Sequence, residues 1–426
     1  MKRILLLVLP AALLLAGACT KSVPTVVESI DAFTEVGDTG ILVDAIEITV
    51  ADARSIRRLK ADDFDIVCNV PDGQVDRETG GPLREYADDG IVLSRRGKTL
   101  RIEANPFSIN GMRGENYRRM PWKLLCSADT LLNVDLQKVT ARHTAILDDC
   151  IQGSFTYAGI TREYMLYLPK DRKGEPLKHV PLMVWQIGGG EYDRDLWTAA
   201  TANRCLVSLP SEGIPCANLV FAIANPNYTY SASLYPERIE LVDRNNALQM
   251  AFIDTLIADG TVDGSRVFCA GASSGGGCTM RFAMQFPDRF KAAIPCCAMD
   301  PIVPIHRVEE KYEGQFADDL EKAFQGEVYK WNGSEMVLAP MDTEAFVKLP
   351  MFFTHAASDR TCKVASSYAY FEARKRLGAT ADRISIFDDA YMQSYGISPM
   401  ITHFSWVPLL DDFSEGTAMD WLVSQL

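Results

Sequence analysis

Short runs in which hydrophobic and polar residues alternate fill the first third of the chain. Between residues 22 and 145, Gly, Asp, Asn and Pro separate the runs ILVDAIEITV, DFDIVCNV, GIVLSRRG, KTLRIEA and KVTARHTAIL. Alternation with a period of two is typical of strands that bury one face, so this part is predicted to form a small all-β sandwich. Its only His is His143 and its acidic residues are scattered. We interpret it as a structural or carbohydrate-binding module.

From about Cys150 onward, apolar runs alternate with amphipathic stretches. The runs expected to be strands are TREYMLYLP, HVPLMVWQI, NLVFAIA, SRVFCAG, KAAIPCC, LPMFFTHA and DRISIF. Between them, IELVDRNNALQMAFIDTLIADG, CTMRFAMQF and SSYAYFEARKRLGA place apolar residues three and four positions apart, which favours helices. The alternation predicts parallel βαβ units, in which a mostly parallel central sheet is flanked by helices. Ligands of such sheets bind beyond the carboxyl ends of the strands.

The first residues indicate an export signal. A basic start, Met1-Lys2-Arg3, precedes the apolar run ILLLVLPAALLLAGA and then Cys19. The segment LAGAC resembles a bacterial lipoprotein box, in which the Cys becomes the mature N-terminus and carries lipid. We therefore expect an exported lipoprotein of the cell envelope, facing the periplasm or the cell surface, that meets the membrane only through a lipid anchor at Cys19. The alternative is a plain secretory peptide and a secreted protein.

Composition and charge narrow the possible partners. With 426 residues, 47% of them hydrophobic, the chain can bury two cores. A net charge of -13 argues against nucleic-acid binding, which needs a basic surface. Eleven Cys in an exported chain would suggest disulfides, but no pair can be assigned from the sequence. Neither CxxC pairs nor His-rich spacings occur, so we expect no metal site.

One loop combines a predicted strand, a glycine-rich turn and a predicted helix. The strand RVFCA leads directly into Gly271-Ala272-Ser273-Ser274-Gly275, which is the G-x-S-x-G pattern. In this context the glycines permit a strained turn that presents a serine hydroxyl at the end of the sheet. Ser273 is therefore the predicted nucleophile. Ser274 is the competing candidate, although its position is the one whose amide normally faces the substrate oxygen at a helix N-terminus.

A serine hydroxyl needs a general base to become nucleophilic. In α/β hydrolases the base is a His that follows the acid in the chain, and this order selects His403 from the five His, shortly before the terminal helix. His355 is the nearest rival, but it comes too early in that order. The remaining His, which are predicted to lie on surfaces or in loops, are His143, His179 and His306.

The base in turn needs an acid that orients it. The strand LPMFFTH leads into Ala356-Ala357-Ser358-Asp359, which places Asp359 on a loop at the carboxyl edge of the sheet. Asp359 is the predicted acid. Its rivals, Asp388 and Asp389, follow the next predicted strand, ISIF.

An oxyanion hole needs a second backbone donor, usually from the loop after an early strand. The segment MVWQIGGGE offers a glycine run at that place. We predict that the amides of Gly189 and Ser274 are the two donors. The alternative is a glycine turn with no catalytic duty.

At these residues, from about 153 to 426, the chain resembles secreted esterases of the α/β-hydrolase superfamily related to dienelactone hydrolases, phospholipase/carboxylesterases and polyhydroxybutyrate depolymerases. The matching segments are VWQIGGGE, VFCAGASSGGG, FFTHAASDRTCKV and HFSWVPLLDD with MDWLVSQL. It is similar in particular to bacterial esterases that carry an immunoglobulin-like domain, on the strand pattern of residues 22 to 145 and the phrases IEITV and LKADDFDIV. The resemblance implies an α/β-hydrolase fold preceded by a small immunoglobulin-like β-sandwich.

The resemblance also implies the domain limits and the chemistry. We expect a lipoprotein signal peptide at 1–19, the immunoglobulin-like sandwich at 20–148 and the catalytic domain at 149–426. Ser273, Asp359 and His403 would be the catalytic triad of a serine carboxylesterase, with Gly189 and Ser274 in the oxyanion hole and no cofactor. Its substrate would be a small-molecule or glycan-linked ester.

Two departures from the family pattern affect the site. Ile187 stands where the family usually has His before the glycine loop, and His355-Ala356 stand in place of His-Gly before the acid. The first change removes a polar group that helps to hold the oxyanion loop.

Two alternative functions remain, a prolyl-oligopeptidase-type serine peptidase and a catalytically silent, glycan-binding lipoprotein. In addition, residues 300 to 348 exceed the length of a simple crossover. They are hypothesised to overhang the site and set substrate choice, or else to form a solvated amphipathic helix.

Overall fold

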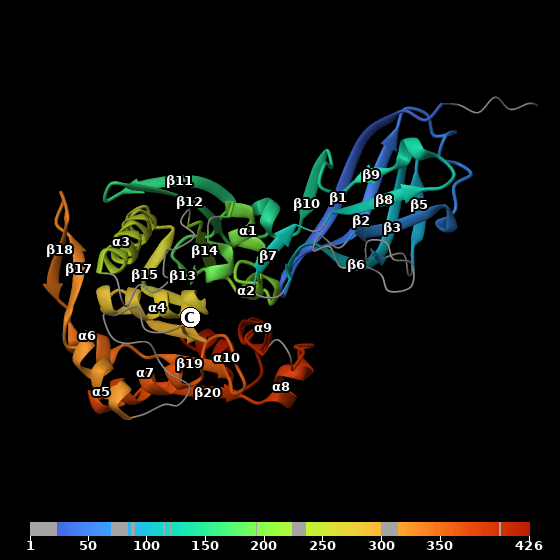
Figure 1. Cartoon of the computed structure of the whole chain (residues 1–426). Coiled ribbons are helices and arrows are strands. Elements are labelled where there is room, and N and C mark those ends of the chain that lie inside the picture. Colours follow the sequence, from blue (N-terminus) through green and yellow to red (C-terminus); the bar gives the residue numbers. More distant parts are fainter. Residues whose placement is uncertain are drawn as a thin grey trace, which may run out of the picture.

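The computed structural model describes residues 24–69, 84–86, 90–113, 116–119, 121–192, 194–223, 236–299, 314–399 and 402–426. The predicted export signal, with Cys19, lies outside these residues, as does His306. Two parts are distinguished below, a β region (residues 24–149) and an α/β part (residues 150–426), and Figure 1 shows them as neighbouring bodies. Within the described ranges, no helix is both long and apolar enough to cross a membrane.

The β region consists of two sheets. The first has the strand order β10-β1-β2-β6-β5 with β7 added to β6, and the second has the order β4-β3-β8-β9. The strands of the first sheet are β1 (Val27–Gly37), β2 (Gly40–Val50), β5 (Val92–Arg96), β6 (Thr99–Arg113), β7 (Asn116–Arg119) and β10 (Ala141–Thr144). Those of the second are β3 (Phe64–Asn69), β4 (Arg84–Tyr86), β8 (Trp122–Cys126) and β9 (Val134–Asp135). Short 3-10 turns occur at η1 (Ala61–Asp63), η2 (Thr130–Leu132) and η3 (Leu147–Asp149).

One hydrophobic core joins these two sheets. Ile46 and Ile102 from the first sheet are buried in the same cluster as Ile66 and Leu124 from the second. Largely alternating residues of β2, β3, β6 and β8 supply it, which is the period of two seen in the sequence. The predicted β region ahead of the α/β part is confirmed. Its immunoglobulin-like identity and the domain limits at residues 19/20 and 148/149 stay predictions.

The α/β part contains a sheet with the strand order β11-β12-β14-β13-β15-β16-β19-β20. Its strands are β11 (Ile151–Tyr157), β12 (Ile160–Tyr167), β13 (Val180–Gln186), β14 (Ala217–Phe221), β15 (Val262–Ala272), β16 (Ala292–Cys296), β19 (Phe352–Ala356) and β20 (Arg383–Phe387). β12 pairs antiparallel with both of its neighbours, and every pairing from β14 to β20 is parallel. The predicted mostly parallel central sheet is confirmed.

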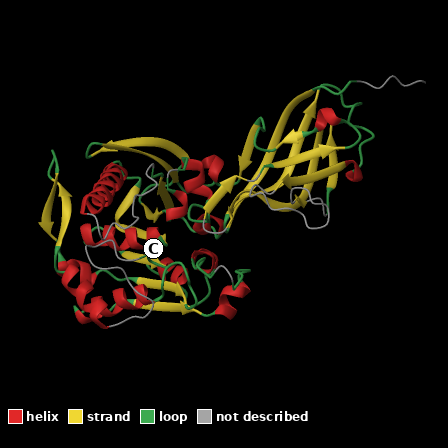
Figure 2. Cartoon of the chain, viewed as in Figure 1, coloured by secondary structure: helices red, strands yellow, loops and turns green. Residues whose placement is uncertain are grey.

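Helices cover both faces of this sheet (Figure 2). They are α1 (Leu196–Thr201), α2 (Ser208–Ser211), α3 (Pro236–Ala258), α4 (Ser274–Gln285), α5 (Gly314–Ala323), α6 (Thr343–Lys348), α7 (Ala365–Arg376), α8 (Asp389–Ser394), α9 (Trp406–Asp411) and α10 (Ala418–Val423), with a 3-10 turn η4 (Gly189–Glu191). Successive residues of β13 point to opposite faces. Trp185 joins a core with α1, α2, α9 and α10, whereas Val184 joins a core with α4, α5, α6 and α7.

The described part of the segment 300 to 348 packs on the α/β part with one face and exposes the other. Leu320 of α5 is fully buried, and Phe324 directly after this helix lies with its ring 5.0 Å from that of Phe346 in α6. A hairpin of β17 (Glu327–Trp331) and β18 (Met336–Pro340) follows α5. α5 is thus amphipathic, with Leu320 buried and Asp318 and Lys322 exposed to solvent, so the alternative of a solvated amphipathic helix stays open. Because residues 300–313 lie outside the described ranges, an overhang above the site stays a prediction.

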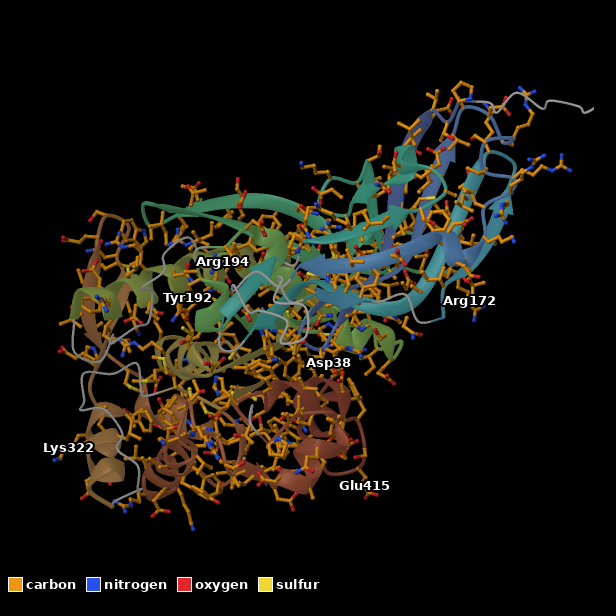
Figure 3. The ribbon with its side chains drawn as sticks, turned by 45° about the vertical axis from the view of Figure 1, so that its right-hand side comes forward. Asp38, Arg172, Tyr192, Arg194, Lys322 and Glu415 are labelled. Carbon is orange, nitrogen blue, oxygen red and sulfur yellow. The ribbon has the colours of Figure 1, made fainter. Side chains whose placement is uncertain are left out.

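The β region contacts the α/β part close to its glycine loop. Val36 of β1 is buried in the core on one face of the large sheet, and Trp197 of α1 packs against the core of the β region. β7 lies against η4. Figure 3 labels Asp38, which lies where the two parts meet, and Tyr192, which directly follows η4.

Candidate active site

The turn between β15 and α4 presents Ser273 at the carboxyl end of the central sheet. The backbone of Ser273 has φ 60° and ψ -124°, a conformation that L-residues rarely adopt. Two backbone hydrogen bonds hold it there, from Ser273 N to Cys296 O at 3.0 Å and from Met299 N to Ser273 O at 3.0 Å. A strained residue fixed by its surroundings at a strand end is typical of a nucleophile elbow.

Glycine is required behind this turn because α4 starts against the backbone of β13. A Cβ on Gly275 would lie 2.0 Å from the carbonyl oxygen of Gln186. Real Cβ atoms do not approach backbone so closely, so only glycine lets helix and strand pack here. The G-x-S-x-G pattern thus has a packing cause as well as a conformational one.

The structure brings Ser273, His403 and Asp359 together. Nε2 of His403 lies 3.0 Å from Oγ of Ser273, and Nδ1 lies 2.7 Å from Oδ2 of Asp359. Asp359 follows β19 in the chain and His403 shortly precedes α9. Asp359 is 5% exposed and His403 9%, so this chain of hydrogen bonds is largely shielded from water.

The carboxyl of Asp359 is held in its ionised form. Burial by itself would raise its pKa, but hydrogen bonds from His355 and His403 outweigh burial and keep the pKa below the usual range. The amides of Thr361 and Cys362 also donate to Oδ1, at 2.8 and 3.0 Å. At neutral pH, Asp359 therefore carries the negative charge that a protonated His403 needs beside it.

The competing candidates have other partners. Nδ1 and Nε2 of His355 lie 2.8 Å from Ser367 Oγ and 2.9 Å from the Cys362 carbonyl, and the ring is fully buried. Ser274 donates from its hydroxyl to the sulfur of Met299. Asp388 accepts from the amide of Tyr391 as the cap of α8, and Asp389 accepts from Ser358. Neither of these acids contacts His403.

The glycine loop after β13 lies directly on the nucleophile turn. A Cβ on Gly188 would be 3.8 Å from the Cβ of Ser273, and one on Gly189 would be 3.0 Å from the hydroxyl of Ser274. The predicted oxyanion donors Gly189 and Ser274 are thus neighbours. Their roles as donors stay a prediction.

Ile187 stands where the family pattern has His, and the structure shows what its side chain contacts. This side chain is buried in the apolar core on one face of the sheet, with 4% exposure. The polar support of the loop comes instead from Glu191, whose carboxyl oxygen Oε2 accepts a hydrogen bond from the amide of Gly188 at 2.8 Å. Sequence reasoning missed Glu191, although an acid directly after three glycines was visible.

A thiol also lies beside the nucleophile, and sequence reasoning did not place it there. Sγ of Cys362 lies 3.8 Å from Oγ of Ser273. Cys297, Asp359 and His403 offer possible metal-ligand atoms within 4.8 Å of one another, but the acid and the base already hydrogen-bond to each other. All ten cysteines of the described ranges are free thiols. Burial raises the pKa of Cys278, for example, to about 12.

A serine, a histidine and an aspartate in this order and contact, at the carboxyl edge of a mostly parallel sheet, define a serine hydrolase of the α/β-hydrolase fold. Residues 243–391 match the prolyl oligopeptidase family, Peptidase_S9. This span contains Ser273 and Asp359 but ends before His403. No curated protein matches the sequence.

Solved structures share the fold. A thermostable esterase has a TM-score of 0.63 at 20% sequence identity, and the likeness covers 93% of this chain and 99% of that one. At this identity the likeness establishes the fold, including a region ahead of the α/β part. A ferulic acid esterase is 15% identical over 60% of this chain and 98% of its own, with a TM-score of 0.39. The acylaminoacyl peptidase of Pyrococcus horikoshii is 12% identical over 91% of this chain and 61% of its own, also with 0.39.

Proposed function

We propose that this protein is a serine carboxylesterase that hydrolyses acyl esters through an acyl-enzyme on Ser273. The observation that carries the proposal is the continuous chain of contacts from the Ser273 hydroxyl through His403 to Asp359. This arrangement supplies a nucleophile, a base within hydrogen-bond reach and an anion that orients the base.

The reaction begins with proton transfer. Nε2 of His403 takes the proton of the Ser273 hydroxyl while Oγ forms a bond to the ester carbonyl carbon. The carbonyl oxygen becomes an oxyanion, and Asp359 stabilises the imidazolium that His403 has become. Collapse of this intermediate breaks the bond to the alcohol, which leaves with the proton from His403. Water then attacks the acyl-enzyme by the same steps, releasing the acid and restoring the Ser273 hydroxyl.

The amides of Gly189 and Ser274 are the proposed donors to that oxyanion. Preorganised donors stabilise charge that develops only in the transition state, and each contributes about 3 kcal/mol. Ser274 begins α4, so the positive end of the helix dipole adds to its amide.

Ester rather than peptide hydrolysis is proposed because the thermostable esterase shares the fold over nearly all of both chains, including the region before the α/β part. The match of residues 243–391 to the prolyl oligopeptidase family favours the second candidate, a serine peptidase. Activity separates the two. The esterase proposal expects turnover of a p-nitrophenyl acyl ester and none of an aminoacyl anilide, and the reverse preference would establish the peptidase.

Active-site labelling tests the nucleophile. A fluorophosphonate should label the wild-type protein and Ser274→Ala, but not Ser273→Ala. Ser274→Ala is the matched control, because it removes a neighbouring hydroxyl and keeps the backbone amide. Absence of labelling in the folded wild-type protein would contradict the hydrolase and favour a silent, glycan-binding protein.

Export and lipid attachment at Cys19 are part of the proposal, supported by the basic start and the LAGAC segment. Expression of the full chain in a bacterium should give a membrane-associated product that incorporates labelled fatty acid. Cys19→Ser should abolish the label, and a label that persists would contradict the anchor. A screen of short-chain, feruloyl and acetyl-sugar esters would identify the substrate.

A further inference from the structure

A buried acid closes the glycine loop beside the nucleophile. Glu191 is the last residue of η4 and is 9% exposed. Burial raises the pKa of its carboxyl to about 8, despite the hydrogen bond from Gly188 that favours ionisation. Burial of an acid costs free energy unless its contacts repay it. The hydrogen bonds of Glu191 must therefore offset the cost of burying its carboxyl.

Glu191 and Gly188 are joined in both directions. The amide of Gly188 donates to Oε2 of Glu191 at 2.8 Å, and the amide of Glu191 donates to the carbonyl of Gly188 at 3.2 Å. The turn between them consists of glycines, which have no side chains to anchor it and which lose the most conformational freedom when ordered. The side chain of Glu191 supplies the missing anchor.

This glycine turn lies directly against the nucleophile and its neighbour. The Cβ positions of Gly188 and Gly189 lie within 3.8 Å of the side chains of Ser273 and Ser274. A shift of the turn by one ångström would move its amides out of hydrogen-bond reach of an oxyanion held on Ser273. The carboxyl of Glu191 thus acts on the reaction through the position of Gly188.

The charge state of Glu191 matters for the same reason. Among the side chains that the structure describes, the buried thiol of Cys205 interacts electrostatically with Glu191. The strand β7, which lies against η4, contributes Arg118 and Arg119 to this neighbourhood. An ionised Glu191 would place a negative charge close to the site where the oxyanion forms. The neutral acid still accepts from Gly188 through its carbonyl oxygen and adds no such charge.

We propose that Glu191 is a positioning residue of the oxyanion loop, whose buried carboxyl fixes Gly188 and thereby directs the loop amides at the substrate carbonyl on Ser273. This inference rests on the proposed hydrolase. In this role, the side chain of Glu191 aligns the glycine loop without contacting the substrate.

Two variants test it with a p-nitrophenyl ester between pH 6 and 10. Glu191→Ala removes the anchor, and kcat should fall about 10- to 100-fold with KM changed less than about twofold, less than the loss of a whole oxyanion donor. Glu191→Gln keeps an oxygen that accepts from Gly188, and kcat at pH 7 should stay within about threefold of wild type. Wild type should lose kcat as pH rises through about 8, and Glu191→Gln should not.

A control variant and the labelling experiment distinguish a failure of the positioning role from a failure of the proposed hydrolase. Glu175→Gln removes an exposed carboxyl in another loop and should keep the wild-type pH profile. A wild-type kcat in Glu191→Ala, or an unchanged alkaline decline in Glu191→Gln, would overturn the positioning role. If Glu191→Ala does not fold, the profile of Glu191→Gln decides alone. Failure of fluorophosphonate to label Ser273 would overturn the hydrolase instead, so the two failures are distinguishable.

Discussion

Nε2 of His355 lies 3.3 Å from Oδ2 of Asp359, and both side chains are completely buried. The same carboxylate oxygen lies 2.7 Å from Nδ1 of His403. The acid is thus held by two imidazoles, one facing the nucleophile and one facing the interior. His355, which the chain order excludes as the base, therefore contacts the acid on the side that faces the interior.

Replacing His355 should weaken catalysis without removing the nucleophile. In His355→Leu, the carboxylate of Asp359 loses one hydrogen-bond donor. The loop that carries Asp359 also loses the hydrogen bond between the imidazole and the carbonyl of Cys362. We expect kcat to fall about tenfold, equivalent to about 1.4 kcal/mol, together with a lower melting temperature. Steady-state kinetics at pH 8 measure this. His143→Leu, in the β region, is the matched control and should leave kcat unchanged. Equal kcat in wild type and His355→Leu would contradict the supporting role.

Gly275 should not tolerate even a methyl group. The added Cβ of Gly275→Ala would meet the backbone of Gln186 at 2.0 Å, so α4 must move away from β13. The expected cost is about 3 kcal/mol or more, with loss of fluorophosphonate labelling. Gly174→Ala is the contrast, since its Cβ meets nothing within 4 Å and its φ of +85° alone should cost about 1 kcal/mol. Urea denaturation measures both, and a larger loss in Gly174→Ala would refute the steric explanation.

The buried ion pair of Arg281 and Asp243 should contribute far more to stability than an exposed pair. Both side chains are at most 2% exposed, and Asp243 also accepts from the amide of Tyr329 at 2.8 Å. Arg281→Met leaves a buried carboxylate without its cation and should cost about 3 to 5 kcal/mol. Lys348→Met, which breaks an exposed pair with Glu344, should change nothing measurable. Similar unfolding midpoints for the two variants would contradict this ranking.

Stability should depend on pH at the junction of the two parts. Burial and the nearby carboxylate of Asp38 raise the pKa of Asp411 to about 7, while Arg204 opposes the shift and Glu212 adds to it. A raised folded pKa means that the proton stabilises the fold at low pH. This contribution is complete below about pH 4, the pKa of an unperturbed Asp, and is lost as pH rises toward 7.

Asp38→Asn removes the main repelling charge on Asp411. Its melting temperature should exceed that of wild type at pH 8 and equal it at pH 4, with a gain below about 1 kcal/mol because solvent screens the site. Differential scanning calorimetry at the two pH values measures the effect. A gain that is the same at both values would show that the proton on Asp411 is not involved.

Local patterns predicted the elements that carry the site. Alternation with a period of two predicted the β region, and apolar runs between amphipathic stretches predicted the parallel sheet. Strand-then-loop segments predicted where Ser273 and Asp359 would lie, because carboxyl ends of parallel strands share one edge. The chain order selected His403, and the structure places all three side chains in contact.

Contacts between side chains from distant segments could not be predicted in this way. The bond from Gly188 to Glu191 depends on how η4 closes, and the contact of Cys362 with Ser273 joins residues 89 positions apart. The burial of Leu320 in α5 depends on a core shared with α6 and α7, and the local sequence does not say which segments form that core. In each case the local sequence of a segment is compatible with several different packing partners.

By itself, the amino-acid sequence determined the kind and order of the elements, the glycine turn at Ser273 and the residue types available for catalysis. These follow from propensity, periodicity and steric limits, which act over a few neighbouring residues. Only the tertiary structure decided which buried groups meet, namely His355 with Asp359 and Glu191 with the glycine loop. The partner of a buried polar group depends on dense packing of the whole fold, because such a group must find its hydrogen bond among whichever segments surround it.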